Sequence, residues 1–237
     1  MIPKKIHYCW FGGKPFPTDI KKYIDSWKKY CPDYEIIQWN ESNYNVHKNL
    51  YVESAYESEK WAFLTDYARL DIIYHEGGIY LDTDVELIKS LDKLLYDSCY
   101  MGMEQIGTVN TGLGFGAEAG CKFLYENMKL YENKTEFMKN GKFMPPICVR
   151  LTTKLLSKKG MQKINEIQNI GEVKIYPTDY FCPLKMGTNK LYITDNTVSI
   201  HHYSASWYKG NYAIRKFKYY LIPVKIFIKK YILRRTE

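Results

Sequence analysis

Short apolar segments alternate with amphipathic segments along the first 81 residues, and this alternation restricts the fold more than any other feature of the chain. It predicts strands at residues 5–11, 34–39 and 79–81. It predicts helices at 18–30, capped by Thr18, and at 60–75, ended by Gly77-Gly78. Such alternation favours an α/β domain with a largely parallel sheet between two helical layers. Ligands of these domains bind beyond the carboxyl ends of the strands.

The second half of the chain carries weaker signals. Asn110-Thr111-Gly112 and the glycines that follow predict a turn-rich segment. We expect helices near residues 123–131 and 151–156, and strands at 173–176 and 198–202. At 237 residues and without an internal repeat or linker, the chain fits one domain with its own core.

The composition is that of a soluble globular protein, with 46% apolar and 25% charged residues. No two of the six cysteines have the spacing of a zinc knuckle or a redox pair, so we expect reduced thiols in a cytosolic protein. The N-terminus lacks the apolar stretch of a signal peptide, and no run approaches the roughly 20 apolar residues of a membrane span. The 23 tyrosines suit a sugar-stacking surface or an aromatic core equally.

The net charge of +8 belongs to the end of the chain. Residues 209–237 hold nine basic residues and one acidic residue, whereas residues 1–208 carry 25 of each. Between Ile214 and Tyr231, apolar residues recur at steps of three and four, which predicts a basic amphipathic helix broken at Pro223. We therefore divide the chain into a domain at 1–210 and a tail at 211–237. Such a tail binds an anionic membrane surface or packs on the domain, and the neutral remainder argues against nucleic acid.

Asp82 and Asp84 follow the strand at 79–81 and form the most informative acidic pair. On extended backbone, residues two apart point to the same side. Two carboxylates held together favour a divalent cation such as Mg²⁺ or Mn²⁺, which in turn binds a diphosphate. Asp66 and Arg69 lie three positions apart on the preceding helix, close enough to pair. Without context, an Asp-x-Asp sequence is also common in solvated loops, and an Asp–Arg pair on a helix is often a surface salt bridge.

The context of these residues is a block that extends from Thr65-Asp66-Tyr67-Ala68-Arg69-Leu70 to Gly77-Gly78-Ile79-Tyr80-Leu81-Asp82-Thr83-Asp84-Val85. This block resembles the sugar-binding region with the Asp-x-Asp motif of glycosyltransferase family 32 and of the glucosylating domains of large bacterial toxins. Residues 6–13, 32–40 and 201–207 resemble further elements of that family, so the resemblance covers residues 1–208. It implies a single-domain GT-A fold with a nucleotide-sugar donor and Mn²⁺ or Mg²⁺.

The resemblance also implies roles for individual residues. Trp10 would stack on the donor's base, unless it is a core tryptophan at a strand end. Asp66 and Arg69 would hold the sugar hydroxyls, and Arg69 would also reach a phosphate. Asp84 would bind the metal directly, whereas Asp82 would contact the ribose or bind the metal through water.

Residues from the end of the domain complete the implied site. One histidine of the pair His201-His202 would be a metal ligand; adjacent strand residues face opposite sides, and we expect His202 to face the metal. Ser206 and Trp207 would lie on a loop that closes over the diphosphate and excludes water. Asn110 would lie near the donor sugar or the acceptor.

The function implied is that of a retaining hexosyltransferase. The donor would be a UDP-sugar, with GDP-mannose as the alternative, and the acceptor a capsular or cell-surface polysaccharide or a lipid-linked glycan at the inner face of the plasma membrane. No carboxylate stands out as a nucleophile, which favours departure of the diphosphate from the face that the acceptor attacks. Family members often carry Thr-Gly-Pro where this chain has Met144-Pro145-Pro146-Ile147, so the acceptor does not follow from the resemblance. A metal-dependent nucleotide-sugar hydrolase or phosphodiesterase and a non-catalytic, membrane-associated sugar-nucleotide-binding protein are the alternatives.

Overall fold

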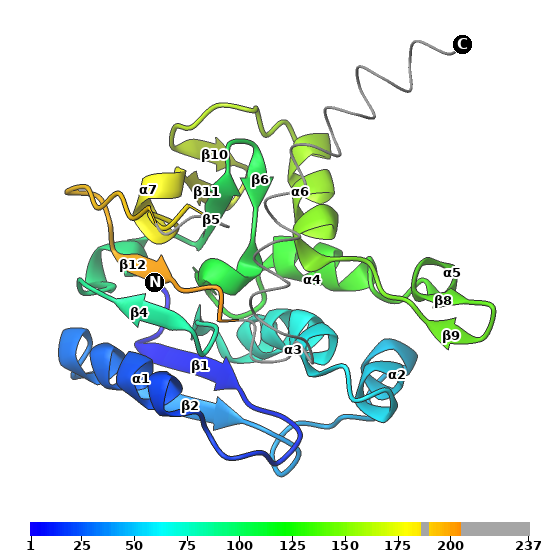
Figure 1. The fold of residues 1–237 in the computed structure, drawn as a ribbon. Helices are drawn as coiled ribbons and strands as arrows, with labels where there is room; N and C mark the ends of the chain where they lie inside the picture. Colours follow the sequence, from blue (N-terminus) through cyan, green and yellow to red (C-terminus); the bar gives the residue numbers. More distant parts are fainter. Residues whose placement is uncertain (186–189, 205–237) are drawn as a thin grey trace, which may run out of the picture.

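The computed structural model describes residues 1–185 and 190–204, so the tail at 211–237 lies outside the described residues. The main sheet has eight strands, with β10-β11-β5-β7-β3-β1-β2 in order and β6 paired with β5 (Figure 1). These strands are β1 (Lys5–Cys9), β2 (Glu35–Trp39), β3 (Gly78–Tyr80), β5 (Cys99–Gln105), β6 (Thr108–Val109), β7 (Phe115–Ala117), β10 (Gln168–Ile170) and β11 (Val173–Tyr176). Two small sheets pair β4 (Val85–Leu87) with β12 (Ser199–His201) and β8 (Met138–Lys139) with β9 (Lys142–Phe143).

The sheet is mixed rather than largely parallel. Strand β1 pairs in parallel with β2 and β3, and β11 pairs in parallel with β5, as the alternating pattern predicts. Between these two parallel groups lies β7, which is antiparallel to both β3 and β5. The sequence pattern misses β7 because Gly116 makes it look like a turn. This glycine is needed for close packing, since a Cβ atom there would lie 2.6 Å from the Tyr100 ring.

The longer helices are α1 (Thr18–Tyr30), α2 (Leu50–Glu57), α3 (Trp61–Glu76), α4 (Lys122–Lys129) and α6 (Cys148–Lys158), with the single-turn helices α5 (Lys134–Phe137) and α7 (Thr178–Phe181) and the 3-10 helices η1 (Asp92–Tyr96) and η2 (Thr111–Leu113). Helices α1 and α3 begin and end within one residue of their predicted limits. Thr18 is not the cap of α1, because Pro17 occupies that position and no side chain bonds the first turn. Helix α2 was not predicted, although the side chain of Asn49 caps it by accepting from the N–H of Val52.

Two hydrophobic clusters cover the two faces of the sheet and give the expected three layers. Helices α2, α3, α4 and α6 pack over one face, where Cys9, Tyr80 and Met101 point. The other face, with Ile6 and Ile79, is covered by α1, β4, η1 and α7. Neighbouring strand residues therefore divide between the two clusters, as alternation along a strand requires.

The β4–β12 pair joins distant parts of the chain beside the carboxyl end of β3. It is antiparallel, with Ser199 opposite Leu87 and His201 opposite Val85. Trp27 of α1 is fully buried, and its Nε1–H donates to the carbonyl of Val85 at 2.7 Å. Helix α1 thus holds β4 in place, and β4 determines where β12 lies.

All six cysteines are free and buried. Within residues 1–185 and 190–204, none of the helices has the length and apolar character required to cross a membrane.

Replacement of Trp27 by Ala should lower the free energy of unfolding by about 3–5 kcal/mol, because it leaves a large cavity and an unpaired Val85 carbonyl. Urea denaturation measures the change. Tyr96→Ala is the control, since Tyr96 is 81% exposed and its loss should matter by less than about 0.5 kcal/mol. A similar effect of both substitutions would contradict the role given to Trp27.

Candidate active site

Asp82 and Asp84 lie in a tight turn that links β3 to β4. The N–H of Val85 donates to the carbonyl of Asp82 at 3.0 Å, which closes the turn. The prediction of extended backbone at this pair is therefore wrong. The turn still brings the two carboxylates to one place, at the carboxyl end of a strand whose partner β1 runs in the same direction.

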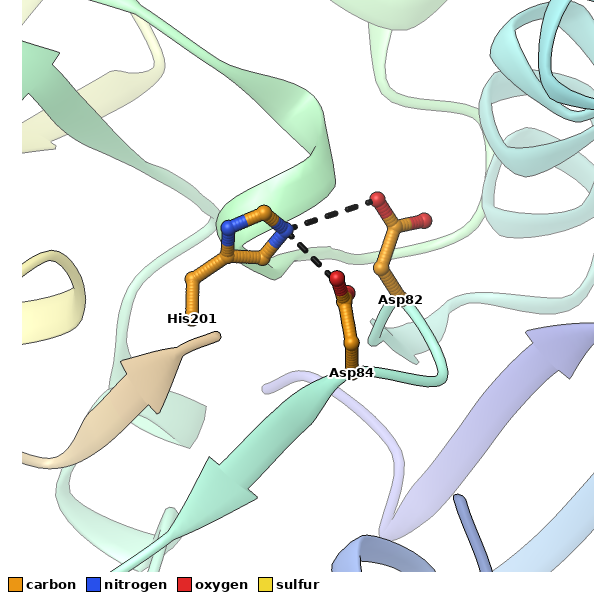
Figure 2. A group of neighbouring side chains, drawn as sticks. All are labelled: Asp82, Asp84 and His201. Atoms are coloured by element: carbon orange, nitrogen blue, oxygen red, sulfur yellow. Dashed lines mark ion pairs between the residues drawn. The ribbon is translucent and has the colours of Figure 1, made fainter. Parts of the chain in front are cut away.

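His201 of β12 completes a three-residue group with the two aspartates. Its Nε2 lies 3.2 Å from Oδ1 of Asp84 and 3.9 Å from Oδ2 of Asp82. One ligand atom from each residue lies within 4.8 Å of the others, and Figure 2 shows the imidazole directed at both carboxylates. Two carboxylate oxygens and an imidazole nitrogen are donors that Mn²⁺ accepts, so the residues present fit a divalent cation.

The choice of His202 as the metal-facing histidine is corrected by this geometry. Nε2 of His202 lies 2.8 Å from Oε2 of Glu86, and its ring stacks on Tyr23 at 4.6 Å between centroids. Adjacent strand residues do point to opposite sides, but the register of β12 on β4 turns His201 toward the aspartates. The sequence alone contains no information on that register.

Electrostatic interactions within the group of Asp82, Asp84 and His201 shift the pKa values of His201 and Asp84. Burial opposes a charge on His201, but the carboxylates of Asp84 and Asp82 outweigh it and raise the pKa to about 10. Burial also opposes the charge of Asp84, yet His201 lowers the pKa of that carboxyl to about 2. Asp84 is further held by the N–H of Ser204, which donates to its Oδ2 at 2.7 Å. In a metal-loaded site the cation takes the place of the His201 proton.

Arg69 connects this group to the preceding helix. Its Nη2 lies 3.0 Å from Oδ1 of Asp66, which confirms the predicted pair, and 3.4 Å from Oδ1 of Asp82. The guanidinium also lies 5.0 Å from the centre of the Tyr80 ring, and the Tyr80 hydroxyl donates to Oδ1 of Asp82 at 2.9 Å. Tyr80 was not singled out from the sequence, although it stands inside the block that defines the motif.

Asn110 reaches the site through the 3-10 turn η2. Its Oδ1 accepts from the N–H of Gly112 at 2.7 Å, and its Nδ2 donates to Glu104 at 3.2 Å. A Cβ atom on Gly112 would lie 2.5 Å from Oδ2 of Asp82 and 3.2 Å from Nη1 of Arg69. The backbone of η2 therefore forms one wall of the site. Glu104 was not singled out from the sequence.

Trp10 follows the carboxyl end of β1 and is half-buried. Its Nε1–H donates to the carbonyl of Lys14 at 2.6 Å, and its ring lies 4.9 Å from that of Phe16. Its role with the donor's base stays a prediction. Ser206 and Trp207 lie outside the described residues, and so does the closing loop predicted for them.

The fold, with its acidic turn after β3, is that of the GT-A glycosyltransferases. The solved structure titled PaToxG Glycosyltransferase matches with a TM-score of 0.51 and 20% identity, covering 67% of this chain and 70% of that one. Residues 17–101 match the family described as "Glycosyltransferase sugar-binding region containing DXD motif". The part of the chain that contains the Asp82–Asp84 turn therefore matches the DXD-containing sugar-binding region of glycosyltransferases.

Two curated relatives agree with this assignment. An uncharacterized glycosyltransferase, L373, of Acanthamoeba polyphaga mimivirus is 33% identical over 60% of this chain and 61% of its own length. Inositol phosphoceramide mannosyltransferase 1 of Schizosaccharomyces pombe is 28% identical over 53% of this chain. This chain spans 41% of the length of the yeast protein, so the similarity covers less than half of that relative.

Replacement of Gly112 by Ala should reduce nucleotide-sugar turnover by about 100-fold, because the added methyl displaces Asp82. Steady-state kinetics with Mn²⁺ measures the loss. Gly116→Ala is the matched control, since its added Cβ meets the Tyr100 ring instead and should lower stability while leaving Asp82 in place. Unchanged turnover in the Gly112→Ala variant would contradict the conclusion that the η2 backbone forms a wall of the site.

Proposed function

We propose that this chain transfers a hexose from a nucleotide sugar to a glycan or lipid-linked glycan acceptor. The observation that carries the proposal is the convergence of Asp82, Asp84 and His201 beside the buried Arg69–Asp66 pair. The first group suits a diphosphate-bound cation, and the second offers a carboxylate and a guanidinium to sugar hydroxyls and phosphate. A nucleotide sugar contains both kinds of group, linked by the bond that breaks.

Asp82, Asp84 and His201 would hold Mn²⁺ or Mg²⁺ in this proposal. When bound, the cation neutralises negative charge that develops on the departing diphosphate. Arg69 lies between both carboxylates and keeps its charge at any accessible pH, so it orients Asp66 and Asp82 and adds positive charge toward the diphosphate. Asn110 holds the η2 backbone and contributes its amide to the donor side.

The donor in this proposal is a UDP-sugar, with Trp10 stacked on the uracil. GDP-mannose is the alternative, and two relatives support it, because inositol phosphoceramide mannosyltransferases 1 and 3 of Schizosaccharomyces pombe are mannosyltransferases by name. A thermal-shift panel of UDP- and GDP-sugars with Mn²⁺ separates the two, because ligand binding stabilises the folded state in proportion to affinity.

We further propose retention of the anomeric configuration by departure of the diphosphate from the attacked face. The acceptor would be a surface or capsular polysaccharide or a lipid-linked glycan at the inner face of the plasma membrane. The names of the yeast relatives, which specify a ceramide lipid, support a lipid-linked acceptor. The basic composition of residues 209–237 supports attraction to an anionic surface.

A transferase and a hydrolase differ in how the rate of nucleotide release depends on acceptor. Without acceptor, the transferase should release nucleotide slowly from its donor, and added acceptor glycan should raise that rate. EDTA should stop release under both conditions. Nucleotide release is followed by a coupled assay, and product NMR gives the anomeric configuration. Release at one rate across all acceptors would favour the hydrolase alternative.

His201→Ala should weaken Mn²⁺ binding by at least about tenfold, the scale on which even an outer partner of a metal ligand acts. Isothermal titration calorimetry measures the affinity. His202→Ala is the matched neighbour and should leave Mn²⁺ affinity close to that of the unmodified protein, because His202 faces Glu86 and Tyr23. The reverse ranking would show that His202 is the ligand.

A further inference from the structure

The two ring nitrogens of His201 have different surroundings. Nε2 faces the carboxylates of Asp84 and Asp82 at 3.2 Å and 3.9 Å, the two ion pairs dashed in Figure 2. Nδ1 is buried and has no hydrogen-bond partner in the part of the chain that the structure describes. A histidine that binds a metal usually donates its other ring N–H to a second group, which fixes the orientation of the ring. The orientation of His201 therefore depends on the side chains packed against it.

The ring of Tyr203 provides such a packing contact. It lies edge-to-face with the His201 ring, with centroids 4.3 Å apart and an angle of 85° between the planes. The Tyr203 hydroxyl lies 2.8 Å from Sγ of Cys182, which is 8% exposed and follows the last residue of α7. Tyr203 also packs against the hydrophobic cluster that contains Cys182. The imidazole is thus connected through Tyr203 to the core.

The backbone of Tyr203 adopts the left-handed conformation, with a φ of 53°. This region is unfavourable for a bulky side chain and persists only where surrounding contacts enforce it. Two N–H groups that flank Tyr203 reach Asp84. The N–H of His202 donates to the Asp84 carbonyl at 3.0 Å, and the N–H of Ser204 donates to Oδ2 at 2.7 Å. Because Tyr203 lies between these donors, its conformation determines whether Ser204 reaches the carboxylate.

We propose that Tyr203 is a positioning residue of the metal site, which orients the His201 imidazole through its ring and the Asp84 carboxylate through its backbone. This inference rests on the proposed function, because that function assigns a divalent cation to Asp82, Asp84 and His201. Tyr203 acts through two of these ligands and is not itself one of them. Loss of its ring should therefore weaken binding of the cation before any sugar or acceptor is present.

The test is the affinity of the full chain for Mn²⁺ alone, measured by electron paramagnetic resonance titration. Tyr203→Asn removes the ring but introduces a residue that tolerates the left-handed backbone, so it should weaken Mn²⁺ binding by about tenfold. Tyr203→Phe keeps the ring and should retain most of the affinity. Tyr203→Val should weaken binding further than Tyr203→Asn, because a β-branched residue also resists the backbone conformation that directs the Ser204 N–H at Asp84.

Tyr180→Asn is the matched control. Tyr180 is another half-buried tyrosine that packs on the same hydrophobic cluster, and its ring lies 4.6 Å from that of Tyr176. This substitution should leave Mn²⁺ affinity unchanged. If circular dichroism shows that Tyr203→Asn does not fold, Tyr203→Leu replaces it, because Leu and Phe both fill the space and only Phe has a ring.

Three outcomes would reduce Tyr203 to a packing residue. They are an Asn or Leu variant that binds Mn²⁺ as tightly as the unmodified protein, a Phe variant as defective as Asn or Leu, and equal weakening by Tyr180→Asn. The variant His201→Ala separates this failure from failure of the proposed function. If unmodified protein does not bind Mn²⁺, or binds it no more tightly than His201→Ala does, the metal site is wrong and this inference is overturned with it.

Discussion

The site depends on one buried guanidinium that lies between two carboxylates. Arg69 is almost without solvent, so its charge must be compensated inside the protein, and Asp66 and Asp82 do so from two different elements. Removal of either carboxylate would leave the cation under-compensated in the interior. The Arg69 ion pairs therefore hold α3 and the acidic turn after β3 together before any ligand binds, and they determine the position of that turn.

The other residues that line the site are arranged around the ion pairs of Arg69. Tyr80 lies under the guanidinium and donates to Asp82, while Gly112 brings the η2 backbone close to both. His201 arrives from β12, which is held by β4 and through it by the buried Trp27. Each group that touches the site is fixed by a neighbour in the core, so the arrangement needs little reorganisation on binding.

The sequence predicts the first half of the fold well because local signals agree there. These signals are the periodicities of strands and helices, the glycines that end a helix, and the spacing of the Asp–Arg pair. Each of them involves residues only a few positions apart. Strand β7 and the choice between His201 and His202 depend instead on the pairing of β7 with β3 and on the approach of β12 to the acidic turn, which join segments far apart in the sequence. Such contacts leave no local pattern, since a one-residue change in register would exchange the two histidines.

The distance in sequence between the acidic turn and His201 also affects the order in which the residues of the site are synthesised. A chain emerging from the ribosome completes the first parallel strands, α3 and the aspartate turn long before residue 201 is synthesised. Synthesis proceeds at about 5–20 residues per second. Several seconds therefore separate the synthesis of Asp82 and Asp84 from that of His201, and the three-residue group is complete only when β12 pairs with β4.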